Sequence, residues 1–283
     1  MERIGSAFPV RHATRIINAF QLRAQSAAFV AAGRDFHRSA VLMLMLRAAL
    51  KGDGRKFSLQ AMSASLHRPR ETVRRAGRAL IAAGFCEADS NSFYLVPGFD
   101  TLPAIVRLSD ALAGIFDALI AGFEAGGIRP PAGSADRPPR ERVAAALDIY
   151  LSVFELSEVQ PAAPTMLYLI GAVTVLNAAR LTDDPVLGCR YGGADDVPPD
   201  DLRCPATLKD VEALDGFPYS TLWRHAVLAE LLGVLEKTPE GYLLARRYLT
   251  YSALSREPLE KVRYIRRVLH DLAAGRYART GAR

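Results

Sequence analysis

The segment Ser58–Leu95, SLQAMSASLHRPRETVRRAGRALIAAGFCEADSNSFYL, decides the fold, because its pattern occurs again 149 residues later. The segment Thr207–Leu244, TLKDVEALDGFPYSTLWRHAVLAELLGVLEKTPEGYLL, aligns with it without a gap. Eight of the 38 aligned positions are identical, among them a proline, a threonine, an arginine and a glycine. A fixed offset of this kind indicates an internal repeat. We refer to 58–96 as the first motif and to 207–244 as the second motif.

Each motif begins with features that are typical of two consecutive helices. Ser58 and Thr207 are predicted N-caps, since a hydroxyl accepts a hydrogen bond from a free N–H of the first turn. After a short turn, Pro69 and Pro218 are predicted at the first position of a second helix, where a missing N–H does no harm. The spacing of apolar residues predicts the buried stripe of that helix, namely Val73, Gly77, Leu80 in the first copy and Leu222, Ala226, Ala229 in the second.

The second half of each motif predicts a helix end followed by two strands. Gly84 and Gly233 are expected to end the helix in the left-handed conformation that glycine adopts without strain. Short runs rich in aromatic and β-branched residues then predict a pair of strands in each copy, at 85–87 and 93–96 and at 234–236 and 242–244.

This order of elements resembles a known family. The residues that carry the resemblance are Ser58-Leu59, Glu71-Thr72-Val73-Arg74-Arg75, Leu80 and Gly84-Phe85. They are similar to the DNA-binding core of MarR- and IclR-type bacterial regulators over about 40 residues per copy and a preceding helix. The resemblance implies a winged helix-turn-helix in each copy, binding of double-stranded DNA and a role in transcription regulation.

The rest of the chain predicts further helices around the two motifs. Apolar periodicity predicts helices at 13–32, 38–50, 104–125, 141–156 and 166–181, with a buried stripe at Ile105, Leu108, Leu112, Ile115, Leu119 and Phe123. We therefore expect a mainly α fold with small β-wings, in which helices join two winged helix-turn-helix units. The expected divisions are an N-terminal half at 1–125, a linker at 126–140, a C-terminal half at 141–250 with a solvated acidic loop at 182–206, and a basic C-terminal helix and tail at 251–283.

The second helix of the first motif is the candidate DNA-binding element. Its segment 68–78 holds five arginines and one glutamate. In a helix-turn-helix the first residues of this helix reach base edges in the major groove, and residues off the buried stripe hold phosphates. The candidates for base edges are Arg68, Arg70, Glu71 and Thr72, and the candidates for phosphates are Ser58, Arg74, Arg75 and Arg78.

The second motif differs in its chemistry. Its net charge is −3, and Trp223 and Val227 stand where the first motif has Arg74 and Arg78. Apolar residues on an exposed face favour a protein contact, so we expect this copy to bind a protein partner or to mediate self-association. The alternative is a weaker DNA contact through Tyr219, Ser220, Arg224 and Lys237, with Trp223 kept as a protein contact.

The charge distribution separates the chain into three parts. The 283 residues carry a net charge of +6, but residues 1–95 carry +9, residues 96–244 carry −10 and residues 245–283 carry +7. Such segregation indicates that different parts meet different partners. Because the C-terminal segment is basic and has an apolar helical face from Pro258 onward, its helix is expected to start at Pro258 and either to pack as a terminal helix or to add a phosphate or dimer contact.

Several other classes of protein are not expected. The three cysteines form no C-x-x-C pair, and the longest apolar run, 166–176, is too short for a bilayer. No phosphate-binding loop, zinc-protease motif or nucleophile elbow occurs. We therefore expect a cytoplasmic, nucleoid-associated DNA-binding protein that is not an enzyme and uses no metal or cofactor. Two alternatives remain open, a replication initiator of the tandem winged-helix type and a winged-helix protein-interaction module.

Overall fold

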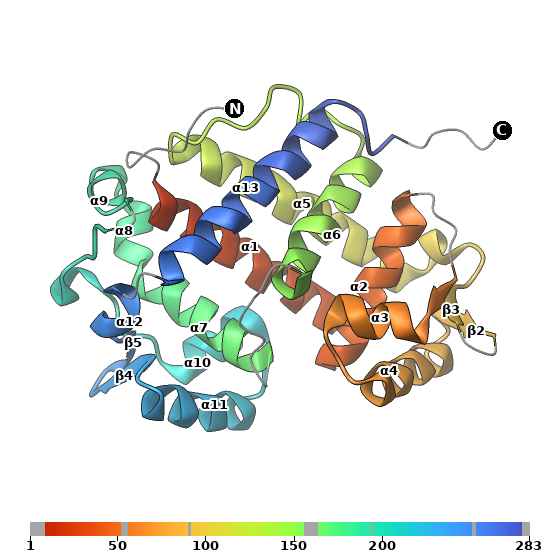
Figure 1. Ribbon diagram of the computed structural model, residues 1–283, viewed down its shortest axis with the longest axis horizontal. Coiled ribbons are helices and arrows are strands. Elements are labelled where there is room, and N and C mark those ends of the chain that lie inside the picture. Colours follow the sequence, from red (N-terminus) through yellow and green to blue (C-terminus); the bar gives the residue numbers. More distant parts are fainter. Residues whose placement is uncertain are drawn as a thin grey trace. The chain divides into compact units, whose positions relative to one another are not determined.

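The chain is mainly helical, with two small antiparallel sheets (Figure 1). The computed structural model describes residues 9–51, 56–89, 92–155, 164–193, 195–250 and 253–278. The helices are α1 (Val10–Ala31), α2 (Phe36–Lys51), α3 (Leu59–Leu66), α4 (Arg70–Ala82), α5 (Pro103–Ala125), α6 (Pro139–Glu155), α7 (Pro164–Asn177), α8 (Ala179–Asp183), α9 (Pro185–Arg190), α10 (Leu208–Asp215), α11 (Tyr219–Leu231), α12 (Arg246–Thr250) and α13 (Ala253–Ala273). The strands are β1 (Phe57–Ser58), β2 (Cys86–Ala88), β3 (Ser92–Leu95), β4 (Leu235–Thr238) and β5 (Gly241–Leu244), and 3₁₀ turns occupy η1 (Phe99–Thr101) and η2 (Asp200–Leu202).

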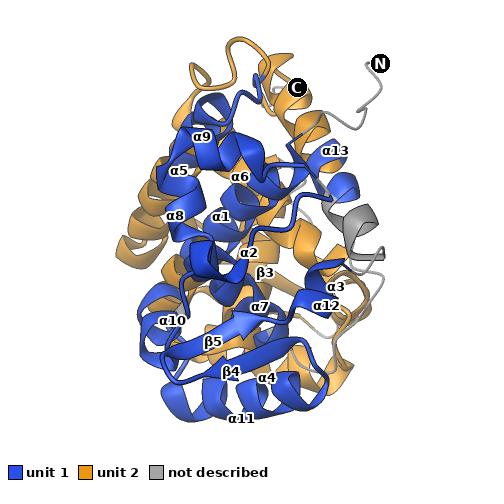
Figure 2. Ribbon diagram, turned by 90° about the vertical axis from the view of Figure 1, so that its left-hand side faces the viewer, with its two compact units in different colours: residues 1–23, 118–130, 161–263 blue, residues 24–117, 131–160, 264–283 orange. Residues whose placement is uncertain are grey.

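The chain divides into two compact units, each built from three separate segments (Figure 2). Unit 1 comprises residues 1–23, 118–130 and 161–263 and contains the second motif. Unit 2 comprises residues 24–117, 131–160 and 264–283 and contains the first motif. This division differs from the continuous halves that the sequence suggests. Local patterns cannot reveal that distant segments return to the same core.

Helix α6 is the clearest case of such a return. We expected it to open the C-terminal half, but it packs against α2 and α3 within unit 2. Its buried Asp148 lies 2.6 Å from the Lys51 ammonium and 3.7 Å from the Arg47 guanidinium, which also pairs with Glu155 at 2.8 Å. Because buried charges are costly unless they are paired, these contacts tie α6 to α2. The hydroxyl of Tyr277 also donates to Asp148, so the segment that follows α13 contacts α6 in the same unit.

The backbone repeats the 149-residue offset in its strand pairing. In the first motif Phe57 and Ala88 both pair with Phe93, on its two sides, and Cys86 pairs with Leu95. The corresponding pairs of the second motif, 206 with 242, 237 with 242 and 235 with 244, lie 149 residues later. The sequence did not predict β1, whose two residues show no alternation. Its pairing with β3 extends the repeat by one more backbone contact.

The predicted helix caps are confirmed in both motifs. The Ser58 hydroxyl accepts from the amide of Ala61 at 3.1 Å, and the Thr207 hydroxyl accepts from the amide of Asp210 at 3.2 Å. Gly84 and Gly233 follow their helices with φ of 76° and 64°, as predicted. Helices α4 and α11 begin one residue later than expected, so that Pro69 and Pro218 are N-caps. This shift leaves the predicted stripes buried in both helices.

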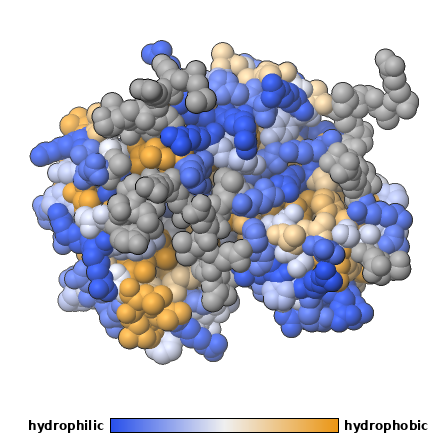
Figure 3. Space-filling model, viewed as in Figure 1, coloured by the Kyte–Doolittle hydropathy of each residue, from blue (hydrophilic) through white to orange (hydrophobic). Residues whose placement is uncertain are grey.

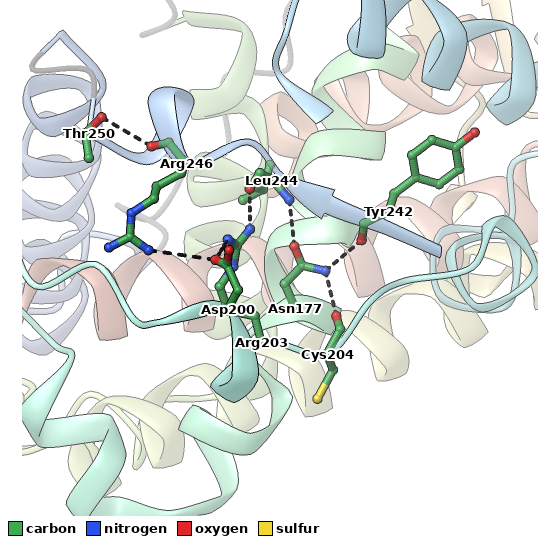
Figure 4. Close-up of polar contacts among 8 residues, drawn as sticks. All are labelled: Asn177, Asp200, Arg203, Cys204, Tyr242, Leu244, Arg246 and Thr250. Carbon is green, nitrogen blue, oxygen red and sulfur yellow. Dashed lines mark hydrogen bonds and ion pairs between the residues drawn. The ribbon is translucent and has the colours of Figure 1, made fainter. Parts of the chain in front are cut away.

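An asparagine at the end of α7 fixes the strand pair of the second motif (Figure 4). The buried Asn177 amide donates to the carbonyls of Cys204 at 2.7 Å and Tyr242 at 3.0 Å, and its oxygen accepts from the amide of Leu244 at 2.8 Å. The Arg203 guanidinium, also buried, donates to the carbonyl of Leu244 and pairs with Asp200 at 2.7 Å. Three separate segments of unit 1 are thus joined by side-chain to backbone hydrogen bonds.

The segment 182–206 is not the solvated loop that its composition suggests. It contains the end of α8, the whole of α9 and the turn η2, and its Arg203 and Ala206 are buried. Helix α9 forms because Pro185 stands at its start and the Asp184 carboxylate accepts from the amides of Val186 and Leu187. The acidic residues therefore include a helix cap, which the count of charges could not reveal.

Two other expectations need correction. Helix α13 begins at Ala253, five residues before Pro258. A proline inside a helix removes one backbone hydrogen bond and need not end the helix, so Pro258 does not mark the start of α13. In α5 the fully buried residue of the central turn is Phe116, whereas Ile115 is only half-buried. Within the described part of the chain, no helix combines the length and apolar character that crossing a membrane requires.

Cys86 and Cys189 differ in their expected reactivity. Burial raises the pKa of Cys86 to about 11, whereas Cys189 is exposed. At pH 8 roughly one Cys86 thiol in a thousand is then a thiolate, the form that reacts. We expect a disulfide reagent to modify Cys189 in the native protein and Cys86 only after unfolding, as measured on variants that each keep one of the two. Equal native rates for both thiols would contradict the buried position of Cys86.

Candidate nucleic-acid interface

Two side-chain hydrogen bonds fix the turn between α3 and α4. His67 adopts the left-handed conformation with φ of 48°, and Gly216, its counterpart 149 residues later, has φ of 77°. A non-glycine residue there needs support from its surroundings. His67 receives it from a hydrogen bond between its Nδ1 and the carbonyl of Phe154 at 2.8 Å, while the Ser63 hydroxyl donates to the carbonyl of Arg68 at 2.5 Å. The start of α4 is therefore rigidly placed.

Helix α4 turns its predicted stripe inward and its charges outward. Its buried residues are Val73, Ala76, Gly77 and Leu80. The exposed residues of the candidate set are Arg70, Glu71, Arg74, Arg75 and Arg78, while Ser58, Arg68 and Thr72 are half-buried. Because the stripe faces the core, most of the arginines share the outer surface of one helix, as the sequence predicted.

The arginines of α4 are not equivalent. The Arg74 guanidinium pairs with the Glu71 carboxylate, with 2.9 Å between Nε and Oε2. Among the described residues, Arg70, Arg75 and Arg78 form no such ion pair. Three full positive charges of α4 are thus available to an external anion, and the fourth is partly neutralised.

Arg68, two residues before the start of α4, is half-buried. The pKa of Arg68 is lowered because burial disfavours its charged form, and its buried Nε has no hydrogen-bond partner. The pKa of His37, at the start of α2, is lowered mainly by burial, raised by Asp35 and lowered further by Arg68 and Arg75. Nothing in the sequence indicates that His37 lies near these two arginines. Both arginines therefore lie near enough to His37 to disfavour its protonation.

The sequence also missed a lysine beside the strands of the first motif. Lys56 precedes β1, and its ammonium lies 2.8 Å from the Asp89 carboxylate and 5.3 Å from the centre of the Tyr94 ring. The Lys56 ammonium is exposed, and its hydrogen bond to Asp89 raises the pKa of Lys56. A cation and an aromatic ring therefore lie together beside the three-stranded sheet of the first motif.

An acid from α10 caps the N-terminus of α11, whereas Glu71, the acid in the first turn of α4, pairs with Arg74. The Glu212 carboxylate accepts from the amide of Tyr219, the first residue of α11, at 2.9 Å. Its counterpart 149 residues earlier is Ser63, which bonds to the turn instead. A helix N-terminus attracts anions through its free N–H groups. Because Glu212 already supplies the negative charge, α11 is a poor site for a phosphate.

The outer face of α11 is largely apolar. Tyr219, Trp223, Leu228, Leu231 and Leu232 are exposed. Other exposed candidates are Ser220, Arg224 and Lys237, with Arg224 as the single positive charge of the helix. The face therefore lacks the density of cations found on α4.

The described residues show no arrangement typical of a metal site. No group of three or more histidine, cysteine, aspartate or glutamate side chains lies close enough together there to hold an ion. The acidic residues of 182–206 act instead as a helix cap and as partners of arginine, as Asp184 and Asp200 illustrate. No protein-family model, curated protein or solved structure matches the chain.

Proposed function

We propose that the chain binds double-stranded DNA through α4 and acts as a nucleoid-associated transcriptional regulator rather than as an enzyme. In this proposal both motifs are winged helix-turn-helix units, and the first residues of α4 enter the major groove. The observation that carries the proposal is the exposed arginine face of α4, on which Arg70, Arg75 and Arg78 have no ion-pair partner among the described residues. A basic surface of this kind is typical of proteins that bind the phosphates of a duplex.

The contacts divide by position along the first motif. Arg70, Glu71 and Thr72 lie in the first turn of α4, the part that meets base edges in a helix-turn-helix. Arg75 and Arg78 lie further along the outer face and suit phosphates. Lys56 stands beside the strand pair, where a wing approaches the adjacent backbone of the duplex. This division gives α4 the role of reading sequence and the flanking cations the role of holding the duplex.

The second motif takes no part in this contact in our proposal. Its net charge is −3, Glu212 occupies the N-terminus of α11, and one arginine replaces the arginine cluster of α4. The negative charges of the second motif would repel the phosphates of a duplex. The first motif alone therefore accounts for the affinity.

The proposal is tested by the salt dependence of binding to a labelled random duplex. Three cations that each neutralise a phosphate, Arg75, Arg78 and Lys56, give a slope of log K against log salt of about −2.7, or roughly a 40-fold loss of affinity between 50 and 200 mM salt. Fluorescence anisotropy at four salt concentrations measures this slope. Absence of binding at 50 mM salt would remove the proposed function.

A further inference from the structure

Helix α11 presents a large apolar patch at the surface. The exposed fractions are 80% for Leu231, 64% for Leu232 and 52% for Trp223. Tyr219 and Leu228 add to them, and the space-filling view shows hydrophobic residues gathered over this helix at the lower left (Figure 3). Together the five residues expose on the order of 600 Å², the upper end of what a monomeric protein shows in one patch.

The core of unit 1 does not need these side chains. Leu222, Ala226 and Ala229 already fill the inner face of α11, which packs against α7 and α10. A single exposed leucine is ordinary, but five large apolar residues on one helix lower solubility unless a partner covers them. Since Glu212 and the net charge of the motif disfavour DNA here, the partner is a protein surface.

The pattern of the patch is complementary to itself. Tyr219, Trp223, Val227 and Leu231 are spaced four residues apart, so they form one ridge along the outer face. Two ridges of this type interdigitate in the commonest class of helix packing, at a crossing angle of about −50°. With a two-fold axis at Val227, Trp223 of one copy packs beside Leu231 of the other.

Charge and area agree with a pairing of two copies. The face carries one positive and one negative side chain, Arg224 and Glu230, so the two faces that meet carry no net charge. A stable interface buries about 800 Å² on each partner, with an apolar centre and a polar rim. The apolar patch supplies most of that area, and Ser220, Arg224 and Glu230 supply the rim.

We propose that α11 forms the centre of a two-fold interface between two copies of this chain. The inference rests on the patch alone and holds whether or not α4 binds DNA. Together with the proposed function it has one consequence. A dimer carries two α4 helices and would recognise two half-sites related by a two-fold axis.

The test uses the single tryptophan of the chain, which lies in the patch. Sedimentation equilibrium of the full chain is expected to give twice the chain mass, and dilution is expected to shift Trp223 emission to the red as the interface opens. Leu231→Glu is expected to weaken self-association at least 100-fold and to give red-shifted emission at every concentration, because each dimer then buries two charges. Circular dichroism checks that the variant is folded.

The matched control is Val186→Glu, since Val186 is 75% exposed on α9 of the same unit and lies outside the patch. This variant is expected to remain a dimer. A monomeric wild type at 100 μM, an assembly larger than a dimer, or a folded Leu231→Glu variant that still pairs would each overturn the proposal. A monomeric Val186→Glu variant would overturn the placement of the interface on α11.

Discussion

Replacing Arg75 and Arg78 together by alanine is expected to lower the affinity for duplex DNA by roughly 100-fold at moderate salt. Each arginine that contacts a phosphate or base edge contributes about 1–2 kcal/mol, and each lost phosphate contact reduces the salt slope by about one. Both side chains are exposed and neither is tied into an ion pair among the described residues, so the fold should be unaffected. Fluorescence anisotropy with a labelled duplex measures both the affinity and the slope.

The repeat supplies the control for this variant. Arg224 lies 149 residues after Arg75, at the same position of its own motif, and it is also exposed. Arg224→Ala is expected to change the affinity less than threefold. A loss as large as that of Arg75→Ala would show that the second motif also binds DNA, which contradicts the proposal that it takes no part in the contact.

Replacing Asn177 by alanine is expected to lower the free energy of unfolding of unit 1 by about 3 kcal/mol. The substitution leaves the carbonyl of Cys204 and the amide of Leu244 without their partner and removes one of the two donors to the Tyr242 carbonyl, and each such loss costs about 1 kcal/mol. Because these groups lie at the root of β5, the strand pair would lose its connection to α7. Urea unfolding at a fixed protein concentration, followed by Trp223 emission, reports this unit.

Thr174→Ala is the matched control on the same helix. The Thr174 hydroxyl donates to the carbonyl of Ile170 at 2.7 Å, which is a bond within α7. Its removal leaves the backbone of the helix intact and should cost less than about 1 kcal/mol. If Asn177→Ala were no more destabilising than this control, the side chain would not hold the strands as the structure indicates.

Local chemistry explains why much of the fold follows from the sequence. The hydroxyls of Ser58 and Thr207 and the glycines 84 and 233 act within one turn of their own position, so their roles can be predicted without knowing the rest of the chain. The buried stripes of α4 and α11 follow in the same way from periodicity. These features gave the helix–turn–helix–strand order of both motifs and the outward direction of the arginines.

Long-range contacts explain what the sequence could not reveal. Asn177 ends an apolar helix, and nothing nearby indicates that it bonds to residues 27 and 65 positions later. The return of α6 to the first motif depends on charge pairs between distant segments, as Arg47 with Asp148 shows. The role of Glu212 could have been predicted from the sequence. Position 63 of the first motif is a serine, and the equivalent position 212 is an acid that lies beside the start of α11.

The most direct test of α4 as the DNA-binding helix is a photochemical crosslink from equivalent positions of the two motifs. Thr72 and Thr221 occupy the same place in α4 and α11 and are both half-buried. In a Cys189→Ser, Cys204→Ser background, in which buried Cys86 stays unlabelled, Thr72→Cys or Thr221→Cys would carry an aryl azide. A duplex is expected to crosslink from position 72 and not from position 221. Crosslinks from 221 alone, or from neither position while the duplex is bound, would contradict the assignment of DNA binding to α4.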